Sequence, residues 1–303
     1  MKYYYCIDIG GTGTKCGVID ENDKLVFFEK IKTAEILKSN NFAFALSQFL
    51  HTIEAKSGFL VDDSLGMGIG LPGLIDSPSG IVCYSRCLNL KNYKLVENLK
   101  KYFHVAIKIS NDAELATQAE LHYGIGKKIK NFVLLTLGTG VGCGIVIDGK
   151  SLRETRPLSC EFGHTKIFDD EFEQFASTKA LEKQTALALT KNKQCEMWKS
   201  FSPETVNGTT IFKFLNDDKV AKEVFDKFVS YIGDGIVNIV NTFCPEAVVI
   251  GGSISAEKET LTKPIQDYVN NHTFTKNAGY TVKVVSAKMT RFSGIFGAKT
   301  LFI

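Results

Sequence analysis

The stretch that decides the fold is Asp8-Ile9-Gly10-Gly11-Thr12-Gly13-Thr14-Lys15, close to the start of the chain. Apolar runs at residues 3–7 and 16–19 flank it, so the pattern predicts a strand, a glycine-rich turn and a second strand. A turn with almost no side chains lets backbone N–H groups approach a phosphate, and its threonine hydroxyls add donors. The carboxylate at the end of the first strand is suited to a hydrated Mg²⁺. Taken alone, the stretch also fits a tight hairpin without a ligand.

Size and composition are those of a globular protein with a substantial core. The 303 residues suffice for two ordinary domains, and 44% hydrophobic with 23% charged residues is typical of soluble proteins. A net charge of +3, without a block of like charges, argues against a nucleic-acid partner or an anionic membrane. No apolar stretch approaches the roughly 20 residues of a membrane span, and the N-terminus lacks the regions of a signal peptide. We therefore expect a cytoplasmic protein.

The eight cysteines do not show the spacing of a metal site. No C-x-x-C pair occurs, and Cys83 and Cys87, the only close pair, lack a second pair at zinc-site spacing. Several others lie in apolar strand-like runs, where a free thiol behaves as a small hydrophobe. We expect reduced thiols and no zinc site.

Strands and helices alternate in two halves that begin alike. In the first half the pattern predicts strands near 3–9, 14–20, 25–32, 65–69 and 105–109, and helices near 41–55, 96–103 and 113–123. In the second it predicts strands near 132–137, 142–147 and 247–250, and helices near 173–189, 220–243 and 292–301. This indicates a duplicated α/β architecture with a cleft between a smaller lobe, residues 1–123, and a larger one, residues 124–290. We expect the last helix, about 291–303, to pack back on the smaller lobe.

Glycine turns recur at residues 10–13, 138–142 and 251–252, each directly after an apolar run. Backbone N–H groups from turns in both halves would close on one polyphosphate. In this hypothesis Gly138, Thr139 and Gly140 grip phosphates, while Gly251 and Gly252 let a nucleotide pack close to the backbone.

Six motifs in a fixed order resemble the ROK family of bacterial sugar kinases and sugar-responsive repressors. They are Asp8-Ile9-Gly10-Gly11-Thr12, Gly68-Ile69-Gly70-Leu71-Pro72-Gly73, Asn111-Asp112-Ala113, Leu137-Gly138-Thr139-Gly140-Val141-Gly142, Glu161-Phe162-Gly163-His164 and Gly251-Gly252. The resemblance runs from residue 8 to the end of the chain. It implies the actin-like ATPase (ribonuclease H-like) fold of hexokinases, α/β with two lobes around a central cleft.

The resemblance implies that Asp112 is the catalytic base that takes the proton from a sugar hydroxyl. Asp112 follows a predicted strand and begins a predicted helix, and a helix N-terminus favours the charged carboxylate. Such a carboxylate is a weak base, which phosphoryl transfer tolerates because its loose transition state depends mainly on positioning and charge neutralisation. The alternative is a simple helix cap.

The resemblance also implies a set of sugar contacts, expected from Gly73, Asn89, Asn111, Asp112, Glu161, His164 and Glu173. Carboxylates, amides and imidazole suit a ring of hydroxyl groups that both donate and accept. The glycine in this set would let the sugar lie against the main chain. For His164 alone, a solvent-facing or core histidine is the alternative.

One departure from the family concerns zinc. Many ROK proteins follow their Glu-x-Gly-His with a long loop in which that His and three Cys bind a structural zinc, whereas residues 165–173 contain no cysteine. The following segment, 173–181, keeps the family's Glu-x-x-Ala-Ser-x-x-Ala-Leu pattern, so we expect a zinc-less member whose Glu173 still faces the sugar. The phenylalanines of this region either replace the metal as an apolar support or belong to the core; they are Phe162, Phe168, Phe172 and Phe175.

The combined hypothesis is an ATP-dependent sugar kinase of the hexokinase or glucokinase type, a phosphotransferase with an alcohol acceptor, favouring O6 of a hexose such as glucose. Mg²⁺ would be held by Asp8, through water. The nucleotide contacts are expected from Asp8, Gly10, Gly11, Thr12, Thr14, Lys15, Gly138, Thr139, Gly140, Gly251 and Gly252. N-acetylmannosamine and β-glucosides remain alternative substrates, and the use of polyphosphate in place of ATP stays open. The resemblance implies a homodimer.

Three hypotheses of other classes compete with the kinase. A sugar-responsive repressor needs an N-terminal helix-turn-helix, for which a first strand at about residue 3 leaves no room, and a basic face is lacking. A non-catalytic sugar sensor would not need Asp112. A polymerising actin-like structural protein would not need the sugar motifs at 111–112 and 161–164.

Overall fold

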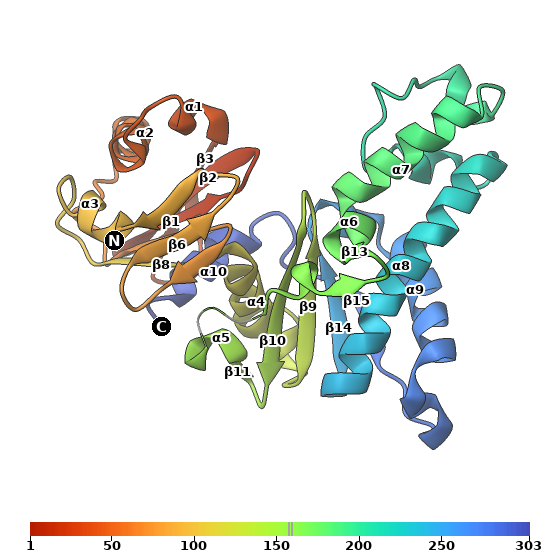
Figure 1. Ribbon diagram of the computed structural model, residues 1–303. Coiled ribbons are helices and arrows are strands. Elements are labelled where there is room, and N and C mark those ends of the chain that lie inside the picture. The colour runs from red at the N-terminus through yellow and green to blue at the C-terminus, as the bar shows by residue number, and fades with distance from the viewer. Residues whose placement is uncertain (157, 159) are drawn as a thin grey trace. The chain divides into compact units, whose positions relative to one another are not determined.

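The computed structural model describes residues 1–303 except 157 and 159, and the chain forms two compact units (Figure 1). The first unit comprises Met1–Gly124, Ser151–Ser159 and Arg291–Ile303, and the second comprises Ile125–Lys150 and Cys160–Thr290. Ser151–Ser159 falls within the range expected for the C-terminal lobe but belongs to the first unit.

The first unit is built on a five-stranded sheet of order β3-β2-β1-β4-β8. Its strands are β1 (Tyr3–Ile9), β2 (Gly13–Asp20), β3 (Leu25–Lys32), β4 (Met67–Leu71) and β8 (Ile107–Asn111). The first three form an antiparallel meander, and β4 and β8 add to β1 in parallel. The central strand β1 is an almost continuous apolar run because both of its faces are covered.

Helices and a small second sheet complete the first unit. The helices are α1 (Thr33–Leu37), α2 (Phe42–Ser57), α3 (Leu95–Leu99), α4 (Asp112–Tyr123), α5 (Leu152–Thr155) and α10 (Ser293–Thr300); the small sheet is β5 (Leu74–Asp76), β6 (Ile81–Ser85) and β7 (Leu90–Tyr93). The C-terminal helix α10 packs on α4 and β1. The approach is close, because a Cβ at Gly297 would lie 1.9 Å from the carbonyl oxygen of Leu115.

The second unit repeats the same sheet order, β11-β10-β9-β14-β15. Its strands are β9 (Phe132–Leu137), β10 (Val141–Ile147), β11 (Lys150–Ser151), β14 (Ala247–Gly251) and β15 (Lys283–Ser286). Here β9 pairs antiparallel with β10 and parallel with β14, which pairs parallel with β15. The predicted duplication of a hairpin-led α/β pattern is therefore confirmed.

The remaining elements of the second unit are mainly helical. They are α6 (Glu173–Ala176), α7 (Thr178–Lys191), α8 (Lys219–Phe243), α9 (Glu259–His272), the hairpin β12 (Lys166–Ile167) and β13 (Asp170–Glu171), and the 3₁₀ turns η1 (Ile125–Lys127), η2 (Phe162–His164), η3 (Glu196–Lys199), η4 (Thr210–Phe214), η5 (Ser253–Glu257) and η6 (Phe274–Ala278). In Figure 1, α8 and α9 run beside each other, and they pack together.

The single helix predicted near 173–189 is wrong. Ser177 has extended backbone, with ψ of 158°, and separates α6 from α7. Its hydroxyl accepts a hydrogen bond from the N–H of Ala180 at 3.0 Å, which makes it the N-cap of α7.

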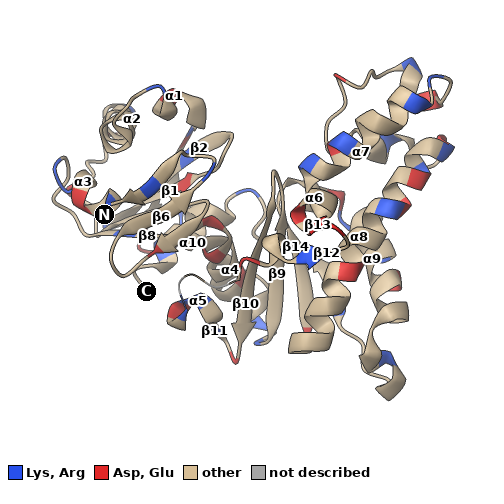
Figure 2. Ribbon diagram, viewed as in Figure 1, with Lys and Arg blue, Asp and Glu red and all other residues tan. Residues whose placement is uncertain are grey.

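Charge is dispersed along the helices of the second unit. In Figure 2, basic and acidic residues are interspersed along both α7 and α8. Among the described residues, none of the helices combines the length and the apolar character needed to cross a membrane.

Candidate active site

The turn between β1 and β2 is closed by its own backbone and exposes its tip. The N–H of Gly10 donates to the carbonyl oxygen of Gly13 at 3.0 Å, while Gly11 and Thr12 are exposed. These two residues present backbone and hydroxyl donors without covering side chains. The tip is therefore the part of the turn that suits a phosphate.

Thr14 supports this turn from inside. Its side chain is completely buried, and its hydroxyl lies 3.0 Å from that of Thr33, which donates to the carbonyl oxygen of Gly10 at 2.6 Å. The sequence analysis expected a phosphate contact from the Thr14 hydroxyl. The structure places that hydroxyl in the interior instead, where its partner Thr33 is the first residue of α1, directly after β3.

Asp8 and Lys15 form an ion pair across the hairpin. They are direct cross-strand partners, with 2.7 Å between Lys15 Nζ and Asp8 Oδ2, and both side chains are largely covered. A Cβ at Gly294, in the first turn of α10, would lie 2.4 Å from the carboxyl carbon of Asp8. A carboxylate suits Mg²⁺, but since Oδ2 already accepts from Lys15, this one fits a metal held through water better than direct coordination.

Asn111 joins the start of α4 to the turn at Gly73. Its Oδ1 accepts from the N–H groups of Ala113 and Glu114 at 2.9 and 3.1 Å, and its Nδ2 donates to the Gly73 carbonyl oxygen at 3.0 Å. Gly73 has φ of +115°, and a Cβ there would lie 2.2 Å from the Tyr84 carbonyl oxygen. Asn111 is only 6% exposed, so it acts first as a structural link and presents little surface to a sugar.

Asp112 is the first residue of α4 and is half-buried. Its Oδ1 accepts from the N–H of Ala113 at 2.9 Å, and the helix N-terminus favours its ionised form. The N-cap position belongs to Asn111. The alternative of a simple helix cap therefore describes the neighbour of Asp112 rather than Asp112 itself.

Cys87 lies beside the first glycine turn, a contact that was not anticipated from the sequence. A Cβ at Gly11 would lie 3.9 Å from its Sγ. Partial burial of the sulfur raises the pKa of the Cys87 thiol, the hydrogen bond with Ser85 opposes this, and the charge of Asp112 raises the pKa further. The Cys87 side chain thus lies beside the tip of the first glycine turn.

Asn89 lies on the same β6–β7 connection as Cys87. It is exposed and has φ of +52°, a conformation that asparagine tolerates better than most residues. Its amide is free of the packing that covers Asn111, so it keeps the exposure that a sugar contact requires.

The turn between β9 and β10 is also closed by its own backbone, but over one residue fewer than the first turn. The N–H of Gly138 donates to the Gly140 carbonyl oxygen at 2.9 Å, and Thr139 is exposed. The turn is joined to α7, since the Gly138 carbonyl oxygen accepts from the N–H of Lys179 at 3.2 Å. Gly252, with φ of +84°, lies against it, because a Cβ there would be 2.2 Å from the Leu137 carbonyl oxygen.

Glu173 contacts this second turn directly. Its Oε2 accepts from the N–H of Val141 at 3.3 Å, and a Cβ at Gly140 would lie 2.4 Å from the same oxygen. A residue expected to bind the sugar and a turn expected to bind phosphates are thus adjacent. The sequence motifs did not show this contact, because Glu173 and Gly140 lie far apart in the chain.

The Glu161-x-Gly163-His164 motif packs against the start of β10. A Cβ at Gly163 would lie 2.1 Å from the Val141 carbonyl oxygen, so only glycine permits this approach. The N–H of His164 donates to the Glu161 carbonyl oxygen at 3.1 Å and closes η2. The backbone of the motif is thereby held against the first residue of β10.

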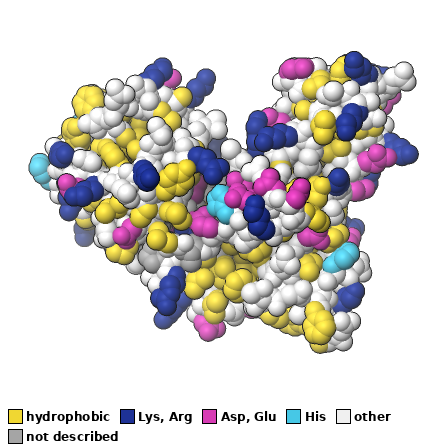
Figure 3. Space-filling view, viewed as in Figure 1, with side chains coloured by type: hydrophobic (Ala, Val, Ile, Leu, Met, Phe, Trp, Pro, Cys, Tyr) yellow, Lys and Arg dark blue, Asp and Glu magenta, His cyan; other side chains and the backbone are white. Residues whose placement is uncertain are grey.

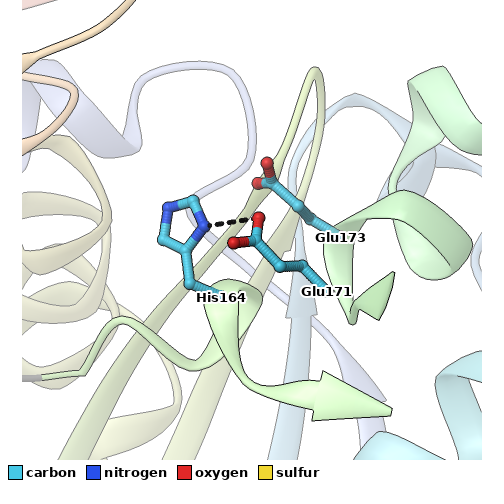
Figure 4. A group of neighbouring side chains, drawn as sticks. All are labelled: His164, Glu171 and Glu173. Carbon is cyan, nitrogen blue, oxygen red and sulfur yellow. Dashed lines mark hydrogen bonds and ion pairs between the residues drawn. The ribbon is translucent and has the colours of Figure 1, made fainter. Parts of the chain in front are cut away.

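His164, Glu171 and Glu173 gather at one place in the second unit (Figure 4). His164 Nδ1 lies 3.1 Å from Glu171 Oε2, and one ligand atom from each residue falls within 4.8 Å of the others. Figure 3 shows acidic side chains beside a histidine on the same face. The sequence analysis named two of these residues and missed Glu171.

A cavity of about 680 Å³ lies elsewhere in the second unit. It is lined by residues 190–196 at the end of α7 and 217–220 at the start of α8. None of the expected site residues lines it, so it takes no part in the candidate site.

Comparison with known proteins supports the family resemblance that the motifs indicated. The family model described as the ROK family matches residues 4–303. A glucokinase of Halalkalibacterium halodurans is 28% identical over 284 residues, which cover 88% of this chain and 85% of that protein. A beta-glucoside kinase of Listeria innocua is 27% identical over 258 residues, which cover 84% of each.

Solved structures agree as well. A ROK family glucokinase from Streptomyces griseus, solved in complex with glucose and AMPPNP, matches with a TM-score of 0.85 and 25% identity over 99% of this chain and 98% of that one. Together with the repeated sheet order, this match confirms the predicted actin-like ATPase fold.

Proposed function

Because the chain belongs to the ROK family, we propose that it is an ATP-dependent sugar kinase, with O6 of a glucose-type hexose as its first candidate acceptor. The observation that carries the proposal is the position of Asp112 near the first glycine turn, within the first unit. At the N-terminus of α4, the Cα of Asp112 would lie 3.7 Å from a Cβ at Gly70, and Gly70 is the sheet partner of Asp8, which precedes the glycine turn by two residues. A base beside a phosphate-binding turn is the arrangement that phosphoryl transfer to a hydroxyl requires.

The first unit supplies the base and part of the phosphate binding. Asp112 accepts the proton of the attacking hydroxyl, and the hydrogen bond that its Oδ1 accepts from the N–H of Ala113 orients the carboxylate. The backbone of Gly10 and Gly11 and the hydroxyl of Thr12 bind phosphate oxygens. ATP would supply the phosphoryl group, and its Mg²⁺, held by Asp8 through water, would neutralise developing charge.

The second unit supplies the other phosphate turn and the sugar contacts. Gly138, Thr139 and Gly140 bind phosphates, and Gly251-Gly252 lies against the nucleoside. Glu161, His164 and Glu173 hydrogen-bond the sugar hydroxyls. Since Glu173 also accepts from the N–H of Val141, this sugar contact is joined directly to the phosphate turn, which favours precise alignment of the acceptor.

A β-glucoside is the second candidate substrate. The relative from Listeria innocua is named a beta-glucoside kinase and is almost as similar as the glucokinase. N-acetylmannosamine stays a third candidate, and we further propose that the protein is a homodimer, to be measured by light scattering.

A panel of sugars tests the proposal. The purified protein with Mg-ATP is offered glucose, mannose, N-acetylmannosamine, N-acetylglucosamine and a β-glucoside, and ADP release is coupled to a spectroscopic readout. We expect the highest kcat/KM for a glucose-type hexose, with the product phosphorylated at O6 by NMR. Polyphosphate replaces ATP in a parallel arm. Sugar binding by calorimetry without turnover of any sugar would identify a sugar-responsive regulator and overturn the kinase.

A further inference from the structure

A short hairpin brings Glu171 to His164. Strands β12 and β13 pair Lys166 with Glu171, and beyond them the N–H of Phe172 donates to the Thr165 carbonyl oxygen at 2.8 Å. The hairpin follows η2 directly, so its second strand returns the chain to the end of the Glu-x-Gly-His motif. There Glu171 Oε2 lies 3.1 Å from Nδ1 of His164 (Figure 4).

Aromatic side chains hold this hairpin in place. Phe172 is completely buried and meets Phe162 edge-to-face, with ring centroids 5.5 Å apart. Phe168 and Phe175 both contact Tyr231 of α8, at 5.8 and 5.1 Å, and each other at 5.7 Å. Phe172 thus anchors the segment that carries Glu171 in the core, whereas Phe168 is 69% exposed. A well-anchored carboxylate can fix the orientation of its partner.

We propose that Glu171 is the positioning residue of His164. An ionised carboxylate only accepts hydrogen bonds, so the 3.1 Å contact requires a hydrogen on Nδ1. A neutral ring with Nδ1–H keeps the lone pair of Nε2 free to accept from a sugar hydroxyl. Glu171 itself does not touch the sugar, and the role of His164 as a sugar contact rests on the proposed function.

The energetic value of the pair lies in orientation rather than in stability. The side chains of His164 and Glu171 are 47% and 30% exposed, and solvent-screened pairs contribute little to folding. A ring that is already held in one tautomer and one rotamer loses less conformational entropy when it binds its ligand. The effect should therefore appear in sugar affinity.

A metal ion is the competing explanation of the cluster. The ligand atoms of His164, Glu171 and Glu173 are close enough to share one. However, Glu173 Oε2 already accepts from the N–H of Val141, and Glu171 Oε2 accepts from His164. The direct histidine–carboxylate pair accounts for these contacts without a metal, and a bound metal becomes one outcome of the test.

Kinetics of three variants test the positioning role. Glu171→Leu removes the acceptor and should raise the sugar KM about tenfold with kcat changed less than about threefold. Glu171→Gln keeps an acceptor oxygen and should show a smaller rise. Asp169→Asn, an exposed position on the same hairpin, is the matched control and should leave KM unchanged. A KM for Glu171→Leu equal to that of the wild type overturns the proposal.

A double-mutant cycle separates positioning from a structural role. If Glu171 acts through His164, adding Glu171→Leu to His164→Ala should change the sugar KM no further than His164→Ala alone. Full multiplication of the two effects would show that Glu171 acts independently and would overturn the proposal.

An NMR measurement tests the pairing of His164 with Glu171 independently of enzyme activity. With ¹⁵N-labelled histidine, long-range proton–nitrogen spectra of the five histidines, assigned with His164→Ala, should show a protonated Nδ1 at His164 that is lost in Glu171→Leu. If the sugar panel shows no turnover while this result holds, the proposed function fails and the pairing survives. A proton on Nε2 alone, or stoichiometric zinc that Glu171→Leu releases, overturns the pairing whatever the activity.

Discussion

Asn111 offers the sharpest test of how the first unit is assembled, because one side chain serves two parts of it. Asn111→Ala deletes the two bonds that Oδ1 accepts from Ala113 and Glu114 and the one that Nδ2 donates to Gly73. The residue is only 6% exposed, so water does not readily replace the lost partners. The start of α4 and the Gly73 turn should both loosen.

The expected magnitude follows from these contacts. Loss of an N-cap costs about 1 kcal/mol, and loss of a buried side-chain bond to a carbonyl oxygen costs about 1 kcal/mol more. We therefore expect Asn111→Ala to lower the free energy of unfolding by about 2 kcal/mol. Asn111→Asp keeps the oxygen that caps α4 and loses the donor to Gly73, so about half of the loss should remain.

Hydrogen exchange at the start of α4 is the assay, supported by urea denaturation. Local exchange is preferred because a chain of two compact units need not unfold in one step. Asn41→Ala is the matched control, since Asn41 caps α2 with one exposed bond to the N–H of Phe44. The reasoning is refuted if Asn111→Ala speeds exchange of Ala113 and Glu114 no more than Asn111→Asp does, or destabilises no more than Asn41→Ala.

Three further predictions concern other parts of the molecule. An alkylating reagent on Cys87 should block phosphoryl transfer, whereas modification of the exposed Cys244 should not. Because the pKa of Cys87 is raised, its labelling rate should still climb at a pH where an ordinary thiol is ionised. The block should come from the bulk of the reagent, so Cys87→Ser should stay active, and its inactivation would contradict this prediction. Burial raises the pKa of Glu114, so the folded protein binds its proton more tightly than the unfolded chain and wild-type stability is lost as pH rises through about 4.5. In denaturation curves, the free energy of unfolding of Glu114→Gln minus that of the wild type should therefore grow from about pH 4.5 towards pH 7. A decline over this range would contradict a raised pKa of Glu114. Gly163→Ala should destabilise by about 1–3 kcal/mol in thermal melts because its Cβ meets the Val141 carbonyl oxygen, and an unchanged melting temperature would count against the packing described.

Much of the fold was accessible from the sequence because its strands are apolar runs bounded by glycine turns. The helix α9 and the strand β15 were missed. The helix begins after Lys258, which has φ of +48° and gives no side-chain cap, and it contains Pro264. The sequence therefore offered a break where the structure has a helix. Ser177 was the opposite case, since an N-cap residue inside the predicted 173–189 helix marked a real boundary.

The candidate site was predictable where it consists of motifs and unpredictable where it depends on distant partners. Thr14 and Asn111 were recognised, but their burial follows from Thr33 and Gly73, which lie far from them in sequence. Glu171 belongs to no motif and gains its meaning only from the hairpin that returns it to His164. Side-chain identity marks such residues as candidates, and only tertiary contacts assign their roles.

The central claim is that Asp112 is the base of a phosphoryl transfer to a sugar hydroxyl. Asp112→Asn tests it cleanly, because asparagine keeps an oxygen for the N–H of Ala113 and so preserves the start of α4. The measurement is transfer of a radiolabelled γ-phosphate from ATP to the best sugar of the panel, with sugar affinity measured by calorimetry in parallel. The account predicts that kcat falls by about 10³-fold while the sugar Kd changes less than about threefold. Transfer by Asp112→Asn at close to the wild-type rate would contradict it.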